Sequence, residues 1–346
     1  MIRLGLGGTS TKAIESIMSP ETIQNDGPNG IYSYPLGQYA NTDKTSTDPC
    51  AVDANDPNLA YKFGTMANET VIAQTFNKDL ANEYGKICGN YSLWSNLTIF
   101  WGCGTNLHRS PYNARNHEYY SEDAVLTSGQ AVAFISGGKE YGVIIAPKHL
   151  AFNDTEINRL GVSVFMTEQQ ARENELRGTQ ASIEDAGALG IMTAFNRVGI
   201  TAANAHTGLL KNILRGEWGF KGLESQDFIM NPNYAVLKEY ALNGGTMTTF
   251  TGENTMAAVS EKFAYWTTEN VGQDTELMSA IKQAMTWQAY ALANSNALDG
   301  MASSTRLVSV RTWYDNALVA VQVVFAALTV LAAAMYVLND RKSKKQ

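Results

Sequence analysis

The chain has 346 residues, of which 45% are hydrophobic, so it can bury one large core and carry a small appendage. Its formal net charge is −7, and four of its 26 basic residues and one of its 33 acidic residues lie after residue 339, which leaves 22 basic and 32 acidic residues before that point. Such an acidic surface argues against nucleic acid as a partner, because binding phosphates requires a basic surface.

The first hundred residues predict loops followed by a helix and a strand. Residues 1–20, rich in Gly, Ser and Thr, predict an irregular lead-in, and residues 37–58, rich in Asp, Asn, Thr and Pro, predict a long loop. Residues 97–100 read as a strand. A helix is expected before that strand, because apolar residues recur there at a spacing of three or four, at Ile72, Phe76, Leu80, Tyr84 and Ile87.

Further along the chain, strands and helices alternate. Residues 141–146 form a continuous apolar run, typical of a parallel strand covered on both faces, and Lys148 and His149 follow at its C-terminal end. Thr167 and Gln170 form a capping box before a helix that is expected to reach about residue 185. Residues 189–194 are the next expected strand, and a helix over residues 283–292 follows later. This alternation favours βα units.

The C-terminal segment 317–338 contains no charged side chain. It is long enough to cross a hydrocarbon core about 30 Å thick, and it lacks the polar stripe of a core helix, so it predicts a transmembrane helix; a buried core helix is the alternative. Residues 301–316 would be a juxtamembrane linker. The basic tail 339–346 predicts a cytoplasmic C-terminus of a single-pass protein in the cell membrane, with the large domain extracellular.

Two further patterns limit the interpretation. The three cysteines, Cys50, Cys88 and Cys103, lack metal-site spacing and are expected to be free or buried thiols. No nucleotide loop, zinc spacing or cofactor-binding lysine motif is present, so we expect no cofactor and no metal. Residues 1–8 do not read as an export signal, and we therefore expect further sequence upstream of an outward-facing domain.

Several separated motifs resemble, in order, those of the barrel domain of glycoside hydrolase family 3, the β-glucosidase-like enzymes. They are residues 26–30, 106–123 with 148–149, 153–159, 191–197, and 217–222 leading to Asp227. The resemblance covers roughly residues 20–300. It implies a TIM-type (β/α)8 barrel over residues 21–300, complete or incomplete, with its chemistry at the C-terminal ends of the strands.

The resemblance also implies roles for individual residues. Asp227 stands at the family's nucleophile position. The positions that bind the non-reducing-end sugar, or line its pocket, are Asp26, Arg115, Lys148, His149, Arg159 and Met192. Lys148 and His149 alone could also be a solvated loop pair, and Glu156 and Arg159 could either line the pocket or brace it. His108, Arg109 and Glu118 could equally form a structural network beneath the site.

Three departures from the family pattern concern the catalytic machinery. Glu224 and Gln226 precede Asp227 where the family usually has apolar residues and a Ser or Thr, and residues 243–247 lack a commonly found acidic residue. Many relatives also take their acid/base Glu from an α/β sandwich domain, for which this chain has no room. Because some relatives carry that domain before the barrel, we expect an upstream sandwich and a domain-permuted, membrane-anchored protein.

Two functions of different classes follow. The first is a retaining exo-β-glycosidase, a β-glucosidase acting on the terminal sugars of β-linked oligosaccharides or glycosides, with its acid/base supplied from outside this chain. The second is a catalytically silent, membrane-anchored carbohydrate-binding or scaffold protein.

Overall fold

The computed structural model describes residues 10–11, 22–27, 30, 66–94, 97–227, 236–248, 267–298 and 313–343. The chain divides into two compact units, Met1–Gly300 and Met301–Gln346. The expected loop at 37–58, Cys50 and most of the expected linker at 301–316 lie outside the described residues.

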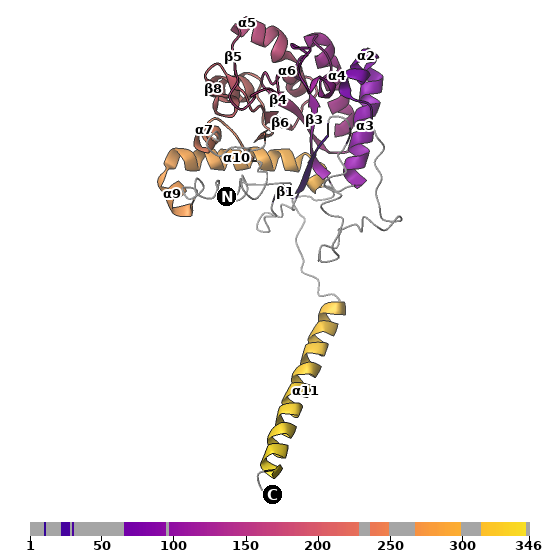
Figure 1. Cartoon of the computed structure of the whole chain (residues 1–346), viewed down its shortest axis with the longest axis vertical. Helices are drawn as coiled ribbons and strands as arrows, with labels where there is room; N and C mark the ends of the chain where they lie inside the picture. The colour runs from indigo at the N-terminus through magenta and orange to yellow at the C-terminus, as the bar shows by residue number, and fades with distance from the viewer. Residues whose placement is uncertain are drawn as a thin grey trace. The chain divides into compact units, whose positions relative to one another are not determined.

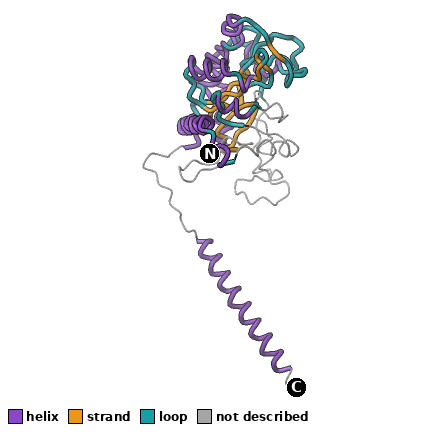
Figure 2. Tube along the Cα trace, turned by 90° about the vertical axis from the view of Figure 1, so that its left-hand side faces the viewer, coloured by secondary structure: helices purple, strands orange, loops and turns teal. Residues whose placement is uncertain are grey.

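The first unit is built on a six-stranded sheet in the order β1-β2-β3-β4-β6-β9. From β2 onward all neighbouring strands are parallel, and β1 pairs antiparallel with β2. Figures 1 and 2 show these strands inside the unit with helices packed around them. The strands of this sheet are β1 (Ser10–Thr11), β2 (Thr22–Asp26), β3 (Leu97–Gly104), β4 (Ile144–Leu150), β6 (Gly190–Thr193) and β9 (Leu223–Gln226). A second, small sheet consists of β5 (Ser163–Val164), β7 (Arg197–Val198) and β8 (Thr201–Ala202).

Helices occupy the connections between the strands. The α-helices of the first unit are α2 (Glu69–Gln74), α3 (Lys78–Trp94), α4 (Ala124–Lys139), α5 (Glu168–Gln170), α6 (Arg177–Glu184), α7 (Leu237–Leu242), α9 (Thr268–Gln273) and α10 (Thr275–Ala293). Two segments are π-helical, η4 (Ala171–Glu175) and η6 (Gly208–Glu217). Three are 3₁₀-helical, η3 (Asn116–Glu118), η5 (Ala203–Ala205) and η7 (Asn296–Leu298).

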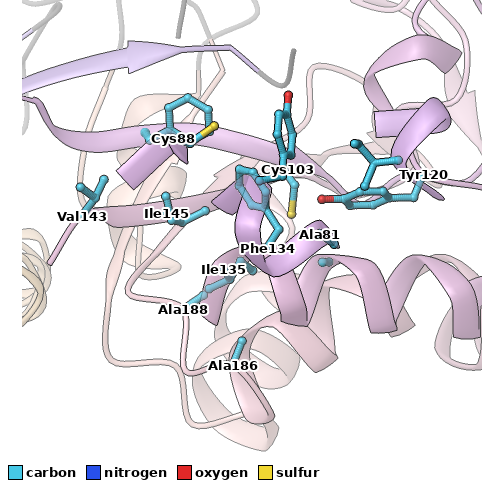
Figure 3. Packing of buried hydrophobic residues seen from close by; sticks show 14 of the residues in the cluster. Ala81, Cys88, Cys103, Tyr120, Phe134, Ile135, Val143, Ile145, Ala186 and Ala188 are labelled. Carbon is cyan, nitrogen blue, oxygen red and sulfur yellow. The ribbon is translucent and has the colours of Figure 1, made fainter. Parts of the chain in front are cut away.

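The central strands β3 and β4 are buried along their whole length, as expected for parallel strands covered on both faces. Phe100 of β3 and Ile145 of β4 point to α3 and α4, whereas Ile99 and Ile144 point to the opposite face, toward α10. Figure 3 shows the first of these layers, in which Phe134 of α4 lies among the strand side chains. The sheet therefore separates two apolar layers, one against α3 and α4 and one against α10.

The sheet is an open, parallel half-barrel among the described residues, which corresponds to the incomplete form of the barrel that the family resemblance allows. Five parallel strands, β2, β3, β4, β6 and β9, are present in this part of the chain. Beyond β9 the sheet continues as a single parallel bridge from Ser225 to Met247. The expected lead-in at 1–20 contains the short strand β1.

The single helix expected around residues 72–87 is two helices. The chain turns between α2 and α3 at Phe76, whose φ is 51°. Asn68 caps α2 by accepting the backbone N–H of Val71. The buried side of α3 carries Ala81, Tyr84 and Cys88. The apolar spacing in the sequence therefore predicted helical structure correctly but not the break, and it marked only part of the buried face.

Helices α3 and α4 pack with their backbones in close approach. A Cβ atom built on Gly85 of α3 would lie 2.0 Å from the carbonyl oxygen of Phe134 in α4, and one on Gly137 of α4 would lie 2.1 Å from the carbonyl oxygen of Asn82. Both distances are far below a van der Waals contact, so only glycine fits at either position.

The second unit contains α11 (Trp313–Ser343). Its stretch Asn316–Met335 is long and apolar enough to cross a membrane by length and composition, and none of it is buried. The helix therefore has no core of its own to cover its apolar side chains.

Candidate active site

The predicted site residues gather where the parallel strands end. Asp26 is the last residue of β2, and Lys148 lies near the end of β4, aligned with Gly104 of β3 on one side and Met192 of β6 on the other. Asp227 follows β9 directly. Because the carboxyl ends of parallel strands share one edge, four distant segments of the chain converge there.

Lys148 is buried and held by carboxylates. Its ammonium forms an ion pair with Asp26, and Nζ lies 3.9 Å from Oε2 of Glu118. The Lys148 side chain is 1% exposed and that of Asp26 is 32% exposed, so the pair reaches from the core to the surface. A buried cation requires such partners, because burying an unpaired charge is very costly.

Arg115 binds Glu118 through two hydrogen bonds, from Nε to Oε1 at 2.9 Å and from Nη2 to Oε2 at 2.6 Å. Burial opposes ionisation of Glu118, but the hydrogen bonds from Arg115 and the charge of Lys148 outweigh it and lower the pKa of Glu118 below its usual range. For Arg115, too, burial opposes the charge, yet Glu118 and the nearby Asp227 raise its pKa. Both groups are therefore charged at neutral pH.

His149 connects this network to Asp227. Its Nε2 atom lies 3.6 Å from Oδ2 of Asp227, and its Nδ1 atom lies 3.1 Å from Oδ1 of Asn106 and 3.3 Å from the hydroxyl of Tyr119. Burial, together with the charges of Arg115, Lys148 and Arg159, lowers the pKa of His149 well below its usual value. His149 is therefore a neutral hydrogen-bonding group and not the cation of an ion pair.

The tautomer of His149 follows from its neighbours. The hydroxyl of Tyr119 donates to the carbonyl oxygen of Asn153 at 3.1 Å, so its proton is already used. This favours a proton on Nδ1, donated to Asn106, and leaves Nε2 as an acceptor facing the Asp227 side of the site.

A second cluster lies on the loop after β4. Glu156 forms an ion pair with Arg159, with Oε2 2.8 Å from Nη1, and its Oε1 atom is 3.7 Å from Nη1 of Arg115. The guanidinium of Arg159 lies over the ring of Phe195, 4.3 Å from its centroid. Glu156 thus joins the two predicted sugar-binding arginines.

Six of the seven predicted site residues, all except Met192, are connected through this set of ion pairs and polar contacts. Met192 is buried in the apolar layer with Trp101 and Ile144, so its contact with a substrate stays a prediction. Arg109 forms an ion pair with the buried Asp154, which joins two loops beside the site. Nε2 of His108 donates to the backbone carbonyl oxygens of Asn116 and Tyr119, as a structural network would require.

Sequence reasoning missed several supporting residues. Asn106 and Tyr119 hold His149, and both lie inside the motif at 106–123, which gave the signal for the segment but not for these roles. Glu69 is buried and accepts the backbone N–H of Gly104 with both carboxylate oxygens, at 2.9 and 3.0 Å. Burial raises the pKa of Glu69 well above its usual value. As one acidic residue in a helix, it gave no signal in the sequence.

The departures before Asp227 are accommodated inside the sheet. Glu224 is buried in β9, and the amide of Gln226 accepts a hydrogen bond of 2.6 Å from Nδ2 of Asn204. The backbone of β9 still places Asp227 at the edge of the sheet. The backbone N–H of Asp227 donates to the carbonyl oxygen of Thr193 in β6 at 3.2 Å. Cys88 and Cys103 are free and buried, as predicted.

No cluster of three His, Cys, Asp or Glu side chains suited to a metal ion occurs in the part of the chain that the structure describes. The groups that converge at the edge are carboxylates, two arginines, a lysine and a neutral imidazole. Such groups can hold a ring of hydroxyls by charge-assisted hydrogen bonds.

Known proteins resemble this chain in sequence. A family profile described as the glycosyl hydrolase family 3 N terminal domain matches residues 58–246. The chain is 31% identical over 218 residues to probable beta-glucosidase J of Emericella nidulans, covering 63% of this chain and 23% of that protein. It is 34% identical over 175 residues to a beta-glucosidase of Ruminococcus albus, covering 51% of this chain and 18% of that protein. The chain thus spans less than a quarter of the length of these relatives.

Solved structures resemble the fold. The match to beta-glucosidase 3B from Thermotoga neapolitana has a TM-score of 0.71 and 24% identity, and it covers 85% of this chain and 41% of that one. Beta-glucosidase from Kluyveromyces marxianus in complex with glucose matches with a TM-score of 0.65 and 27% identity, over 88% of this chain and 34% of that one.

Proposed function

Because the chain belongs to glycosyl hydrolase family 3, we propose that it forms the barrel portion of a retaining exo-β-glycosidase, a β-glucosidase that releases terminal sugars from β-linked oligosaccharides or glycosides. The observation that carries this proposal is the convergence at one sheet edge of Asp227 with Asp26, Arg115, Lys148 and His149. The glucose complex of the Kluyveromyces marxianus relative supports glucose as the bound sugar.

In the proposed reaction, Asp227 attacks the anomeric carbon and forms a covalent glycosyl intermediate, which water then hydrolyses. Asp26 accepts hydrogen bonds from sugar hydroxyls, and Lys148 donates to them. Arg115 and Arg159 donate further hydrogen bonds, and Met192 lines the pocket. His149 accepts a hydrogen bond from a sugar hydroxyl through Nε2. These groups hold the ring with its anomeric carbon toward Asp227, and proximity of this kind lowers the barrier.

The second carboxyl group, which protonates the departing oxygen, is proposed to come from outside the described residues. A general acid must carry a proton before the reaction. Glu118 is bound to Arg115 and has a lowered pKa, and Glu156 is paired with Arg159, so neither suits that role. An α/β sandwich domain before this barrel, in a domain-permuted protein, is our proposed source.

We further propose that α11 anchors the protein in the cell membrane as a single span, with the first unit outside and the basic tail in the cytoplasm. The length and apolar composition of Asn316–Met335 support a span. The basic residues Arg341, Lys342, Lys344 and Lys345 support the orientation.

The decisive experiment replaces Asp227 in the full-length natural protein. Asp227→Asn removes the attacking charge at nearly constant size, and we expect aryl β-glucoside turnover to fall by about 10³-fold or more while glucose binding persists. Asp185→Asn, at an exposed helix end, is the matched control and should leave turnover unchanged. Unchanged turnover in the Asp227 variant would refute the proposed mechanism.

The strand before Asp227 favours one second candidate, a catalytically silent, membrane-anchored protein that binds carbohydrate. Glu224 and Gln226 replace the residues usual in the family at this point, and a changed strand can keep a sugar pocket while losing turnover. Glucose or cellobiose binding by calorimetry without hydrolysis in the full-length protein would support this candidate. Measurable hydrolysis there would eliminate it.

A further inference from the structure

We propose that Glu156 is a positioning residue that fixes the guanidinium groups of Arg115 and Arg159 for sugar binding; this inference rests on the proposed function. Glu156 itself need not touch the sugar. It acts through the two arginines, and through Arg159 above all.

The contacts of Glu156 link the loop after β3 with the loop after β4. Arg115 comes from the loop after β3, and Glu156 and Arg159 come from the loop after β4. The carboxylate of Glu156 uses Oε2 for Arg159 and turns Oε1 toward Arg115, where Oε1 also accepts a hydrogen bond of 3.3 Å from Nδ2 of Asn153. The side chains of Arg115, Glu156 and Arg159 are 17%, 20% and 22% exposed, so solvent screens these charges only in part.

The two arginines depend on Glu156 to different degrees. Arg115 has a second carboxylate, Glu118, which binds it through two hydrogen bonds. Within the described residues, Arg159 forms an ion pair with one carboxylate, that of Glu156, and its other recorded contact is the ring of Phe195. Loss of the charge at position 156 would therefore free Arg159 first and leave Arg115 in place.

Electrostatics adds a second reason for a carboxylate at this position. Burial lowers the pKa of His149, and the charges of Arg115, Lys148 and Arg159 lower it further, so three cations lie around this one imidazole. Glu156 offsets the mutual repulsion of the two guanidinium groups, since like charges at this range disfavour each other. A neutral residue there would leave the arginines repelling each other and able to turn toward solvent.

The expected signature is a change in binding with little change in chemistry. Arginines that hold hydroxyls equally in the ground state and the transition state affect KM and not kcat. Glu156→Gln keeps the size and removes the charge, and we expect glucose affinity to fall about tenfold to hundredfold, the range for one charge-assisted hydrogen bond. Glu156→Asp keeps the charge on a shorter stem and should recover part of that loss.

The test measures D-glucose binding to the full chain by calorimetry, and KM and kcat for an aryl β-glucoside in the full-length natural protein. Glu173→Gln is the matched control, because Glu173 is exposed on η4. We expect the Glu156→Gln variant to bind weakly with kcat within about threefold of the wild type, at an unchanged melting temperature, and the control to match the wild type.

Two results would overturn the inference, and they differ from each other. If the wild type binds glucose and the Glu156→Gln variant binds it within twofold, or if kcat falls as much as 1/KM, the positioning role is wrong while the proposed function stands. If the wild-type protein neither binds glucose nor hydrolyses a glucoside, the proposed function fails and the inference fails with it. Should Glu156→Gln not fold, the Asp variant decides in the same way.

Discussion

At the scale of single residues, burying the carboxyl group of Glu224 has a free-energy cost that its neighbours do not offset. Both of its carboxylate oxygens are buried without a hydrogen-bond partner among the described residues. The nearby hydroxyl of Tyr240 donates to the backbone carbonyls of Glu224 and Met247 instead. Burial raises the pKa of Glu224 to about 7, and the charge of Arg215 offsets this rise only in part. The side chain is therefore largely protonated in the folded protein below neutral pH.

A pH-dependent stability follows from this shift. The folded pKa of about 7 lies above the usual 4.5, so the contribution of Glu224 to stability is complete below pH 4.5 and is lost as the pH rises through 7. Glu224→Gln, which cannot ionise, should gain about 3 kcal/mol relative to the wild type between pH 4.5 and pH 8. Urea unfolding at both pH values measures this gain.

The control for this prediction is Glu184→Gln, an exposed residue at the end of α6. Glu175 is buried as well, with its pKa raised to about 7 by burial and by Asp154, so the wild-type curve alone does not isolate Glu224. Only the difference between the Glu224 variant and the wild type does so. Parallel stability curves for the two proteins would contradict the prediction.

The sequence revealed which residues belong to the edge but not how they pair. The family resemblance placed Asp26, Lys148 and Asp227 in one site, and for Lys148 the expected strand at residues 141–146 gave independent support. Their pairing could not be predicted, since Asp26 and Lys148 are 122 residues apart and a motif carries no contact information. Gln226 shows the same limit, because its hydrogen-bond partner Asn204 lies in a segment that matched no motif in the sequence.

At the scale of elements, the sequence predicted existence and type better than boundaries. The strands at β3, β4 and β6 were expected, because continuous apolar runs suit a parallel sheet covered on both faces. The apolar spacing marked only part of the buried face of α3: Tyr84 is buried, but Leu80 and Ile87 are exposed, and Gly85 of α3 faces α4. Apolar periodicity does not detect a contact made by backbone atoms.

That backbone contact gives a prediction for Gly85. Gly85→Ala would place a methyl group 2.0 Å from a carbonyl oxygen of α4, which the helices can relieve only by moving apart. We expect a loss of about 3 kcal/mol of unfolding free energy, because overpacking of this kind forces backbone shifts. Chemical denaturation followed by circular dichroism measures it.

Gly272→Ala is the matched control, in helix α9, where nothing lies within 4 Å of the added methyl group. Alanine favours helix over glycine, so this variant should gain up to about 1 kcal/mol. A Gly85 variant as stable as the wild type would show that the two helices do not approach as closely as described.

At the scale of the whole molecule, the sequence indicated a large α/β unit and a separate apolar helix, and the structure contains two compact units, Met1–Gly300 and Met301–Gln346. The degree of barrel closure could not be predicted. It depends on how many strands pair with one another, and the family resemblance allowed both a complete and an incomplete eight-stranded barrel.

Membrane association should belong to the second unit alone. In a flotation experiment with phospholipid vesicles, we expect the full chain to float and a chain ending at residue 300 to stay in the aqueous fraction, because Asn316–Met335 supplies the apolar length. The shortened chain should keep the melting transition of the first unit. Flotation of both chains, or of neither, would contradict the assignment of α11 as an anchor.

The alternating ion pairs at the sheet edge also fix the sign of the field that a ligand meets. The site contains four carboxylates, three cations and the neutral His149, so carboxylates outnumber cations by one. The carboxylates are Asp26, Glu118, Glu156 and Asp227, and the cations are Lys148, Arg115 and Arg159. The rest of the molecule before its tail is acidic too. A uronate or a phosphorylated sugar is therefore repelled on approach and at the edge itself, whereas an uncharged ring crosses no such barrier.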